Sequence, residues 1–377
     1  MTLRIAIACS GLGHVQRGVE AWAADLFAAL RQAGAAATLF AAGAVPGAEV
    51  LPCLRRGAPG AIAVAAALRH LGGWRYGLGA PYEVEQTSFA LALWRRVRRD
   101  YDILHVQDPL LALRLEQAHR RGLSRPRVIY ANGTGERAAL LRRFASVQLL
   151  TPAAFADWQG HRVPGQAGFM IPNFIDTARF TPAATPADQA TARAELGLPA
   201  GVPIVLCCAA IRRRHKRIDY LLEEFANSGT DAMLIVVGAR EDDTEALIAH
   251  GARLLGPRVR FLVGLPRSSM PVLYRAADLF VLTSLSEMFG IVLIEAMASG
   301  LPVLCHDTAE FRAIAGPAAQ YADLAQPGGL AAALAALLPG AARTALAATA
   351  RAHVARHFAA EVVVRDILAM YQTVAAA

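Results

Sequence analysis

Residues Thr283–Val303 read TSLSEMFGIVLIEAMASGLPV. The apolar run just before them, Leu279–Leu282, predicts a buried strand because it is short and carries no charge. A loop follows, and the apolar residues Ile291–Ser299 predict a helix that ends at the Gly-Leu-Pro after it. This part of the chain therefore predicts a strand–loop–helix unit of an α/β protein.

The start of this helix offers a place for an anion between two carboxylates. Gly290 lets a ligand approach the backbone closely, and the first N–H groups, at Ile291 and Val292, have no partner within the helix. Glu287 precedes them, while Glu295 lies one turn further on and leans back towards the helix start. A group with phosphate at one end and sugar hydroxyls at the other would fit here. The alternative is an ordinary strand–turn–helix unit with two solvated glutamates.

The spacing of the two glutamates resembles the signature of retaining glycosyltransferase family 4. Glu287 and Glu295 are separated by seven residues that include Phe289-Gly290, and EAMASGLPV completes the pattern. In that family the first glutamate contacts the transferred sugar and the second binds the nucleotide ribose. The resemblance implies these roles here, and it places Phe289–Val292 at the nucleotide-sugar donor.

Strands and helices alternate along the rest of the chain. Predicted strands lie near 3–8, 38–42, 103–107, 127–131, 147–150, 204–209, 232–237, 259–263, 279–283 and 303–306. Predicted helices lie near 19–32, 84–99, 109–121, 218–225, 241–254 and 291–299. Such alternation predicts parallel sheets covered by helices on both faces. At 377 residues we expect two Rossmann-like domains facing an interdomain cleft, and the resemblance implies the GT-B fold.

A proline-containing segment separates the two halves. Residues 171–182 read IPNFIDTARFTP and resemble the I-P-N-G-V-D-x-x-x-F-x-P crossing of the same family, with Phe174 where glycine is usual. The run Thr181–Thr191 predicts a linker. We expect an acceptor-side domain over 1–176, a donor domain over 177–356 and a final helix within 357–377. In the family such a helix crosses back onto the first domain.

The loop after the first predicted strand, residues 10–20, reads SGLGHVQRGVE. Its glycines permit a tight turn, and Gly18 opens a helix whose N–H groups can face a phosphate. The last four residues resemble the G-G-x-E opening of the family, which implies that Gly18 lies near the donor diphosphate. A dinucleotide cofactor is the less favoured alternative, because no acidic residue ends the second strand, TLFAA, to hold a ribose.

Lys216 is the single lysine among 38 basic residues and lies within RRRHKR, residues 212–217. Lysine is a compact point charge and arginine a planar fork, so a lone lysine suggests a site where arginine does not fit, unless it is there by chance. In the family this loop supplies an arginine and a lysine that neutralise the leaving diphosphate. The resemblance implies that Lys216 and Arg212 have this role. Because the usual spacing falls on Ile211, Arg213 is the alternative to Arg212. The alternative is a solvated basic turn.

Two residues of the first half are candidates for contact with the sugar or the acceptor. His105 ends a predicted strand, where it is either a hydrogen-bonding group in the cleft or a buried structural histidine. Asn132 stands where many family members carry histidine, and asparagine cannot take up a proton. Asp100-Tyr101-Asp102 has the form of the metal-binding D-x-D motif, but it precedes a strand and is interpreted as a solvated turn. No metal ion and no cofactor are expected.

The net charge of +8 lies entirely in the first half, because residues 1–176 carry 20 arginines against 12 acidic residues. The arginines gather in pairs such as Arg95-Arg96, Arg98-Arg99 and Arg120-Arg121. This excess fits a peripheral contact with an anionic membrane or an acidic acceptor, or else only solvated helix faces. No aromatic interleaving or known motif accompanies the charge, so we expect no nucleic-acid partner.

The sequence also bears on cellular location. Although 55% of the residues are hydrophobic, no window of eighteen uncharged apolar residues predicts a membrane span. The five cysteines show no ligand spacing and lie mostly on predicted core strands. We therefore expect reduced thiols and a cytoplasmic protein, with membrane association at the inner face as an option.

Taken with the resemblance, these features predict a retaining, metal-independent glycosyltransferase that uses a nucleoside diphosphate sugar such as a UDP or GDP sugar. The acceptor, whether glycan, lipid-linked or small molecule, is left open, as are the base and the sugar. One alternative is a sugar-nucleotide epimerase of the same fold, which needs no second substrate. The other is a non-catalytic subunit that binds a partner transferase.

Overall fold

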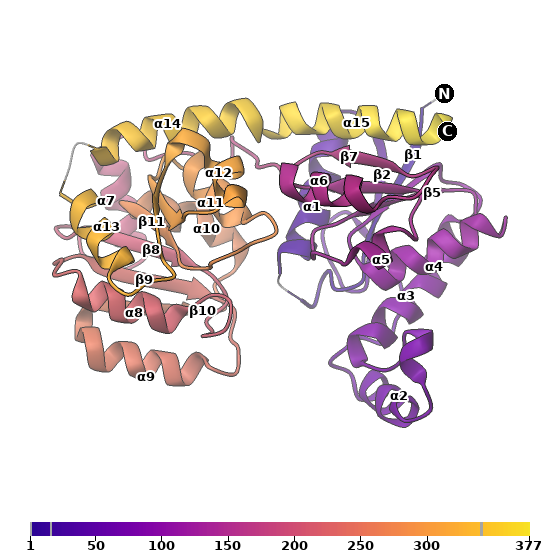
Figure 1. The fold of residues 1–377 in the computed structure, drawn as a ribbon, viewed down its shortest axis with the longest axis horizontal. Helices are drawn as coiled ribbons and strands as arrows, with labels where there is room; N and C mark the ends of the chain where they lie inside the picture. Colours follow the sequence, from indigo (N-terminus) through magenta and orange to yellow (C-terminus); the bar gives the residue numbers. More distant parts are fainter. Residues whose placement is uncertain (1, 16, 340–341) are drawn as a thin grey trace. The chain divides into compact units, whose positions relative to one another are not determined.

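The computed structural model describes residues 2–15, 17–339 and 342–377, which form two compact units (Figure 1). Unit 1 comprises Met1–Asn173 together with Val363–Ala377, and unit 2 comprises Phe174–Val362. Each unit has its own sheet and its own hydrophobic core. The last helix, α15 (Ala360–Ala376), begins in unit 2, and its residues from Val363 onward belong to unit 1.

Unit 1 is built on a parallel sheet of seven strands in the order β3-β2-β1-β4-β5-β6-β7. The strands are β1 (Arg4–Cys9), β2 (Ala36–Ala41), β3 (Ala48–Val50), β4 (Ile103–Val106), β5 (Arg127–Ala131), β6 (Ser146–Leu149) and β7 (Ala167–Met170). The central strands are mostly apolar and almost wholly buried, as expected of parallel strands covered on both faces.

Helices cover both faces of this sheet. On one face, Trp22 of α1 (Gly18–Gln32) and Tyr371 of α15 both pack edge-on against the ring of His105. On the other face, α3 (Pro81–Val97) and α4 (Pro109–Arg120) contribute Phe89 and Leu111 to the core. The remaining helices of the unit are α2 (Pro59–Arg69), the 3-10 helix η1 (Gly73–Tyr76), α5 (Ala138–Leu141) and α6 (Pro152–His161).

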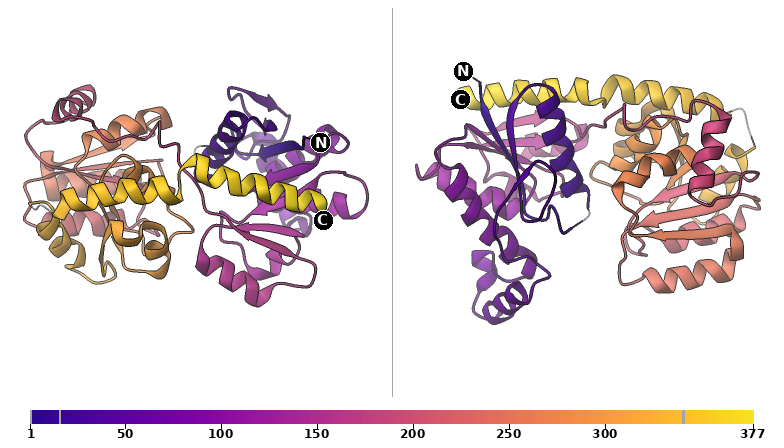
Figure 2. Two further views of the ribbon diagram at one scale, coloured as in Figure 1. Left: turned by 90° about the horizontal axis from the view of Figure 1, so that it is seen from above. Right: turned by 180° about the vertical axis from the view of Figure 1, so that it is seen from behind.

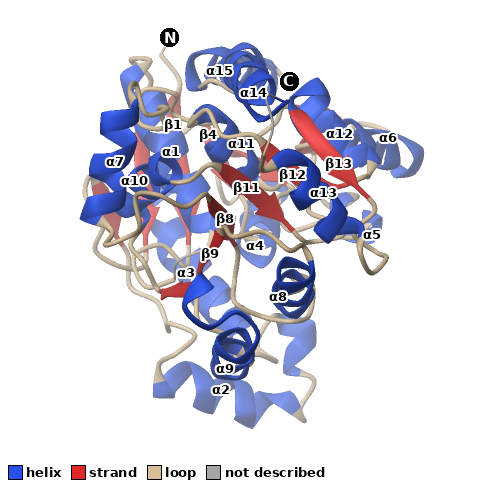
Figure 3. Ribbon diagram, turned by 90° about the vertical axis from the view of Figure 1, so that its left-hand side faces the viewer, coloured by secondary structure: helices blue, strands red, loops and turns tan. Residues whose placement is uncertain are grey.

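Unit 2 has a parallel six-stranded sheet in the order β10-β9-β8-β11-β12-β13. Its strands are β8 (Ile204–Cys208), β9 (Met233–Gly238), β10 (Val259–Val263), β11 (Leu279–Leu282), β12 (Val303–His306) and β13 (Ala319–Ala322). Helices again lie on both faces of the strands (Figure 3). They are α7 (Pro186–Glu195), α8 (Ile218–Asn227), α9 (Thr244–Leu255), α10 (Met270–Ala276), α11 (Ile291–Ala298), α12 (Ala309–Ala315), α13 (Gly329–Leu337) and α14 (Ala342–His357).

Both sheets reverse their strand order at the same place. The first strand pairs with the fourth in each unit, β1 with β4 and β8 with β11. In open α/β sheets, ligands bind outside the carboxyl ends of the strands at this point. In unit 2 the loops that follow these two strands hold Lys216 and Glu287, and in unit 1 they hold His14 and Asp108.

The ten strands predicted from the sequence are all present, with ends that agree within two residues. The predicted linker Thr181–Thr191 is wrong in its second part, because residues from Pro186 onward form α7. The helix starts there because Thr185 accepts a hydrogen bond from the Asp188 N–H, and the Asp188 carboxylate accepts one from the Thr185 N–H. This reciprocal cap stabilises a helix start that composition alone does not reveal.

None of the described helices is long and apolar enough to cross a membrane. Four of the five cysteines are buried and Cys53 is half-buried, and all five are free thiols.

Candidate active site

The structure brings Lys216 and Glu287 together, although they are 71 residues apart in the chain. The Lys216 Nζ donates to Glu287 Oε1 in an ion pair whose side chains are 17% and 13% exposed. Each residue follows one of two adjacent parallel strands, β8 and β11, so the pairing is a direct result of the sheet order. The pair places a cation and a carboxylate side by side at the carboxyl edge of the unit 2 sheet, where ligands bind in sheets of this kind.

The backbone around Lys216 is held in an unusual conformation. His215 and Arg217, on either side of it, have φ angles of 72° and 52°, in the left-handed region that non-glycine residues rarely adopt. The Thr283 hydroxyl donates to the Lys216 carbonyl at 2.8 Å and fixes this backbone to the end of β11. Local strain of this kind persists where the surrounding structure over-determines a functional geometry. It is an independent reason to assign Lys216 to the site.

Arg212 and His215 share this neighbourhood. Partial burial lowers the pKa of His215, and the charges of Glu287, Lys216 and Arg212 act on it in turn. The Arg212 Nε is buried and has no hydrogen-bond partner within the described part of the chain. Arg213 is exposed, and its guanidinium lies 3.7 Å from the Asp219 carboxylate. Arg212 therefore has an unused donor close to His215 and Lys216, whereas Arg213 is engaged at the surface.

The helix start predicted as an anion site is present as α11. Gly290 precedes α11 with φ 71°, so the turn uses the left-handed region that glycine enters without cost. Ile291 and Val292 are the first two residues of the helix and are partly exposed. Phe289 is 3% exposed and packs edge-on against Phe358, which anchors the loop. The N–H groups of this helix start are thus presented from a fixed turn.

Glu295 is more enclosed than the sequence suggested. Its side chain is 5% exposed, and Oε2 accepts a hydrogen bond from the Tyr274 hydroxyl at 2.8 Å. The Arg267 Nη2 lies 3.3 Å from Oε1. Burial raises the pKa of Tyr274 well above its ordinary value, so the phenol stays protonated and remains a donor. A role of Glu295 at a ribose stays a prediction.

Gly18 is the first residue of α1 and is exposed. A Cβ added there would meet no atom within 4 Å, so the helix start has open space in front of it. Two other glycines are required for packing. Gly13, with φ 93°, approaches Gly43 so closely that a Cβ on Gly13 would lie 2.5 Å from the Gly43 Cα. A role of Gly18 at a diphosphate stays a prediction.

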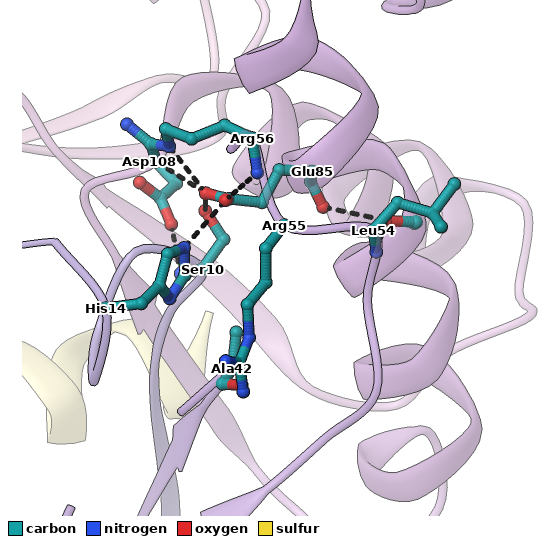
Figure 4. Close-up of polar contacts among 9 residues, drawn as sticks. Ser10, His14, Ala42, Leu54, Arg55, Arg56, Glu85 and Asp108 are labelled. Atoms are coloured by element: carbon teal, nitrogen blue, oxygen red, sulfur yellow. Dashed lines mark hydrogen bonds and ion pairs between the residues drawn. The ribbon is translucent and has the colours of Figure 1, made fainter. Parts of the chain in front are cut away.

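A buried polar cluster in unit 1 was not predicted (Figure 4). Glu85 of α3 is fully buried and accepts hydrogen bonds from Arg56 Nε at 2.9 Å, from the Arg56 N–H at 2.6 Å and from His14 Nε2 at 2.8 Å. Burial opposes ionisation of Glu85, but the bonds from Arg56 and His14 outweigh it and hold its pKa below the usual range. Glu85 is therefore the anionic centre of this cluster.

Two further carboxyl groups lie near it. Asp108 is 5% exposed and accepts the Ser10 N–H at 2.6 Å, and Glu20 is also 5% exposed. Burial raises the pKa of both. The Glu20 Oε2 has no hydrogen-bond partner among the described residues. The sequence did not indicate this cluster because its residues are scattered from position 10 to position 108. The one available signal was that Ser10 and Asp108 each follow the end of a predicted strand.

The two acceptor-side candidates have different surroundings. His105 is fully buried beneath α1 and α15, and its Nδ1 lies 2.8 Å from the Tyr371 hydroxyl. Burial lowers the pKa of His105 to about 3, so the ring is neutral. This environment is that of the second alternative, a structural histidine. Asn132 is 3% exposed at the end of β5, and its Oδ1 accepts the Glu136 N–H at 2.9 Å.

Within the described ranges, no three His, Cys, Asp or Glu side chains are grouped so that they could hold a metal ion. Lys216 and Arg212 supply positive charge at the unit 2 site, as described above.

Comparison with known proteins finds a family match within unit 2. Residues 188–343 match the family described as Glycosyl transferases group 1. A D-inositol 3-phosphate glycosyltransferase of Nocardia farcinica is 38% identical over 148 residues, which cover 37% of this chain and 32% of the relative. The protein of the same name from Salinispora tropica is 33% identical over 216 residues, 52% of this chain and 44% of the relative. The first of these matches thus spans about a third of the relative's length.

Similar solved structures cover the whole chain. Sucrose-phosphate synthase from Thermosynechococcus elongatus superposes with a TM-score of 0.78 at 21% identity, covering 99% of both chains. The HepE protein of Anabaena in complex with UDP-glucose superposes with a TM-score of 0.75 at 18% identity, covering 98% of this chain and 100% of that one. These likenesses show the fold, two Rossmann-like α/β domains of the GT-B type, and so confirm the predicted fold class.

Proposed function

We propose that this chain is a retaining glycosyltransferase that takes a sugar from a nucleoside diphosphate sugar and works without a metal ion. The observation that carries the proposal is the Lys216–Glu287 pair at the carboxyl edge of unit 2, within the segment that matches the group 1 family. The helix start at Gly290 and the free donor of Arg212 add two further groups suited to an anion.

In the proposed reaction, the bond between the anomeric carbon and the diphosphate oxygen breaks while the acceptor oxygen bonds to the same face of the sugar. Lys216 and Arg212 balance the charge that grows on the departing diphosphate, aimed in advance at where it develops. Glu287 orients the sugar and stabilises positive charge at its ring. The acceptor proton passes to the departing phosphate oxygen, so no separate protein base is needed.

The donor is proposed to be a UDP or GDP sugar. A structural neighbour has been solved with UDP-glucose, and the relatives above are named for glycosyl transfer to D-inositol 3-phosphate. Both facts belong to those proteins and suggest which probes to try first. Glu295 as the ribose contact and Gly18 as a diphosphate contact remain part of this proposal. So does a peripheral contact of unit 1 with an anionic membrane, which the arginine excess supports.

Thermal unfolding with a panel of nucleoside diphosphates and their sugars tests the donor site. A ligand at 100 times its Kd adds about 2.7 kcal/mol to the free energy of unfolding, which is readily seen as a higher Tm. We expect one base to stand out and its effect to be lost in Glu295→Ala. Because Glu295 also holds Tyr274, the matched control is Tyr274→Phe, which removes that hydrogen bond and should keep nucleotide binding.

The anomer released first from the donor tests retention. Water can replace the acceptor, and early NMR spectra show whether the free sugar appears with the configuration of the donor before mutarotation. Release of the opposite anomer would contradict the proposal. Conversion of the donor into an isomeric nucleotide sugar would instead support the epimerase alternative. No stabilisation by any nucleotide would favour the non-catalytic subunit.

A further inference from the structure

One surface of unit 1 exposes large hydrophobic side chains to an unusual degree. Among the described residues, twelve such side chains are exposed, and seven of them lie between positions 50 and 82. The six after Val50 are Leu54 at 41%, Ile62 at 51%, Leu71 at 77%, Trp74 at 65%, Tyr76 at 65% and Tyr82 at 47%. We call residues 54–82, which contain α2 and η1, the α2 surface. A concentration of this kind marks an interaction site.

The outward face of α2 carries no polar side chain until its last residue. Ala61 and Ala65 are buried against Val84 of α3, in a small core separate from the main one. The exposed positions are Pro59, Gly60, Ile62, Ala63, Ala66, Ala67 and finally Arg69. Figures 1 and 2 show that α2 lies at the tip of a projection from unit 1. A helix that turns its apolar face away from its own core needs another partner for that face.

The charge of the α2 surface has one sign. No aspartate or glutamate occurs between Val50 and Tyr82, whereas this stretch contains four arginines. Arg56 is paired with Glu85, but Arg69 and Arg75 are exposed at the end of α2 and in η1. The Arg75 guanidinium lies 5.1 Å from the centre of the Trp74 ring. Cationic and apolar side chains are therefore both exposed within a short stretch of the chain, and Arg75 lies beside Trp74.

We propose that the α2 surface docks unit 1 onto an anionic lipid bilayer. Tryptophan and tyrosine favour the boundary between headgroups and acyl chains, and an apolar helix face with flanking arginines lies in that boundary. Each arginine near an anionic leaflet contributes attraction. A second copy of the chain fits less well, because a two-fold contact would set these arginines against their own like charges.

The α2 surface lies apart from the arginine pairs that stand out in the sequence. Arg96 is paired with Glu49, Arg120 with Glu116 and Arg125 with Asp102. Arg98, Arg99 and Arg125 lie in the α3–β4 and α4–β5 connections, at the amino edge of the sheet. The α2 surface lies between β3 and α3, at the carboxyl edge. Of these two places, as far as the structure describes them, the α2 surface is the one that combines several exposed apolar side chains with arginines and contains no acidic residue within its own segment.

The carboxyl edge is also where ligands bind in such sheets. Arg56, just before α2, bonds Glu85, which in turn bonds His14 in the loop after β1. Docking through the α2 surface would bring this edge to the membrane. If the chain is the glycosyltransferase proposed above, its acceptor would be carried by the bilayer. That consequence rests on the proposed glycosyltransferase activity, whereas docking itself does not.

Co-sedimentation of the full chain with phosphatidylcholine vesicles, with and without phosphatidylglycerol, tests the proposal. We expect binding to the anionic vesicles that weakens with salt and falls at least about tenfold in Leu71→Asp and in Trp74→Asp. The double variant Arg69→Gln with Arg75→Gln should bind several-fold more weakly. Leu123→Asp is the matched control, because Leu123 is 55% exposed at the amino edge of the same unit.

Thermal unfolding, nucleotide binding and the oligomeric state distinguish membrane docking from catalysis and from docking to another partner. All these substitutions are at exposed positions, so thermal unfolding and stabilisation by nucleotide should be unchanged, and a failure of nucleotide binding would concern only the proposed function. Wild-type chain that does not sediment with anionic vesicles at low salt would overturn the proposal. So would loss of binding in Arg98→Gln with Arg99→Gln but not in the α2 variants. A dimer in solution that Trp74→Asp abolishes would identify a second copy as the occupant instead.

Discussion

Replacing Glu287 by glutamine separates the two roles proposed for the charged pair in unit 2. Lys216 is assigned to the leaving diphosphate and Glu287 to the sugar, so Glu287→Gln should lower turnover and leave nucleotide affinity near the wild-type value. The change keeps the shape of the side chain. It removes the negative charge, so any difference in rate reports on electrostatics and not on a cavity.

The structure sets the cost to stability. With exposures of 17% and 13%, the side chains of Lys216 and Glu287 are mostly withdrawn from water. Glutamine still accepts a hydrogen bond from Lys216, but the bond loses one of its charges and about half of its strength. We expect the free energy of unfolding to fall by about 1 kcal/mol, which lowers Tm by about 2–4 °C for a unit of this size.

The cost to catalysis should be larger. Removing one preorganised group that stabilises charge in the transition state lowers kcat by about 100- to 1,000-fold. Affinity for the free nucleoside diphosphate depends on the cations, which remain, so its Kd should change by less than about threefold. Lys216, relieved of its ionic partner, would bind the diphosphate no more weakly than before.

Donor hydrolysis and titration calorimetry with the free nucleotide measure the two quantities on the same preparation. Glu223→Gln is the control, because this glutamate of α8 is 57% exposed and lies outside the site. Turnover and affinity falling by the same factor would refute the division of roles. Unchanged turnover would refute the placement of Glu287 at the sugar.

Three other substitutions test the structure around the site. Gly290→Ala places a side chain on a residue with φ 71° and sets its Cβ 3.3 Å from the Leu293 side chain. It should lower the free energy of unfolding by about 1–2 kcal/mol and weaken nucleotide binding, which thermal unfolding with and without nucleotide would measure. The pKa of His105 is about 3 in the folded chain and about 6.5 in the unfolded chain, so the unfolded chain takes up the proton first and the folded state loses stability as pH falls below 6.5. Denaturant titrations should show a loss of about 2 kcal/mol by pH 5. The loss should be absent in His105→Asn. Thr185→Ala should lower the free energy of unfolding of unit 2 by about 1 kcal/mol through loss of the α7 cap and leave nucleotide affinity unchanged, and no effect would mean that the cap contributes nothing.

The fold was predictable because its signals are local. Buried parallel strands are short, apolar and uncharged, so runs such as Ile204–Cys208 and Leu279–Leu282 identify themselves. The residues of the candidate site in unit 2 could be selected from the sequence for the same reason. Glu287, Gly290 and Glu295 fall within nine consecutive residues, and Lys216 is marked by being the only lysine.

The features that were missed depend on contacts between distant residues or on weak local signals. Arg56 and Glu85 are 29 residues apart, and nothing in the sequence between them indicates that they meet. Helix α2 is rich in alanine and short of polar residues, so its sequence has little of the amphipathic period that indicates a helix on a core. His105 was left open between two roles because burial depends on Trp22 and Tyr371, from opposite ends of the chain.

The Arg56–Glu85 bond is one of several hydrogen bonds that connect the α2 surface to the rest of unit 1, and it is the one made to a fully buried carboxylate. The core between α2 and α3 is small, so hydrogen bonds contribute a large part of the attachment. Arg56 adds two side-chain hydrogen bonds and one backbone bond to a carboxylate that is itself fully buried and held ionised. Removing one partner of such a buried pair is costly, because the other charge is left without compensation. The projection is therefore fixed to the loop that carries His14, and a surface held in this way can set the distance of the carboxyl edge from whatever it docks upon.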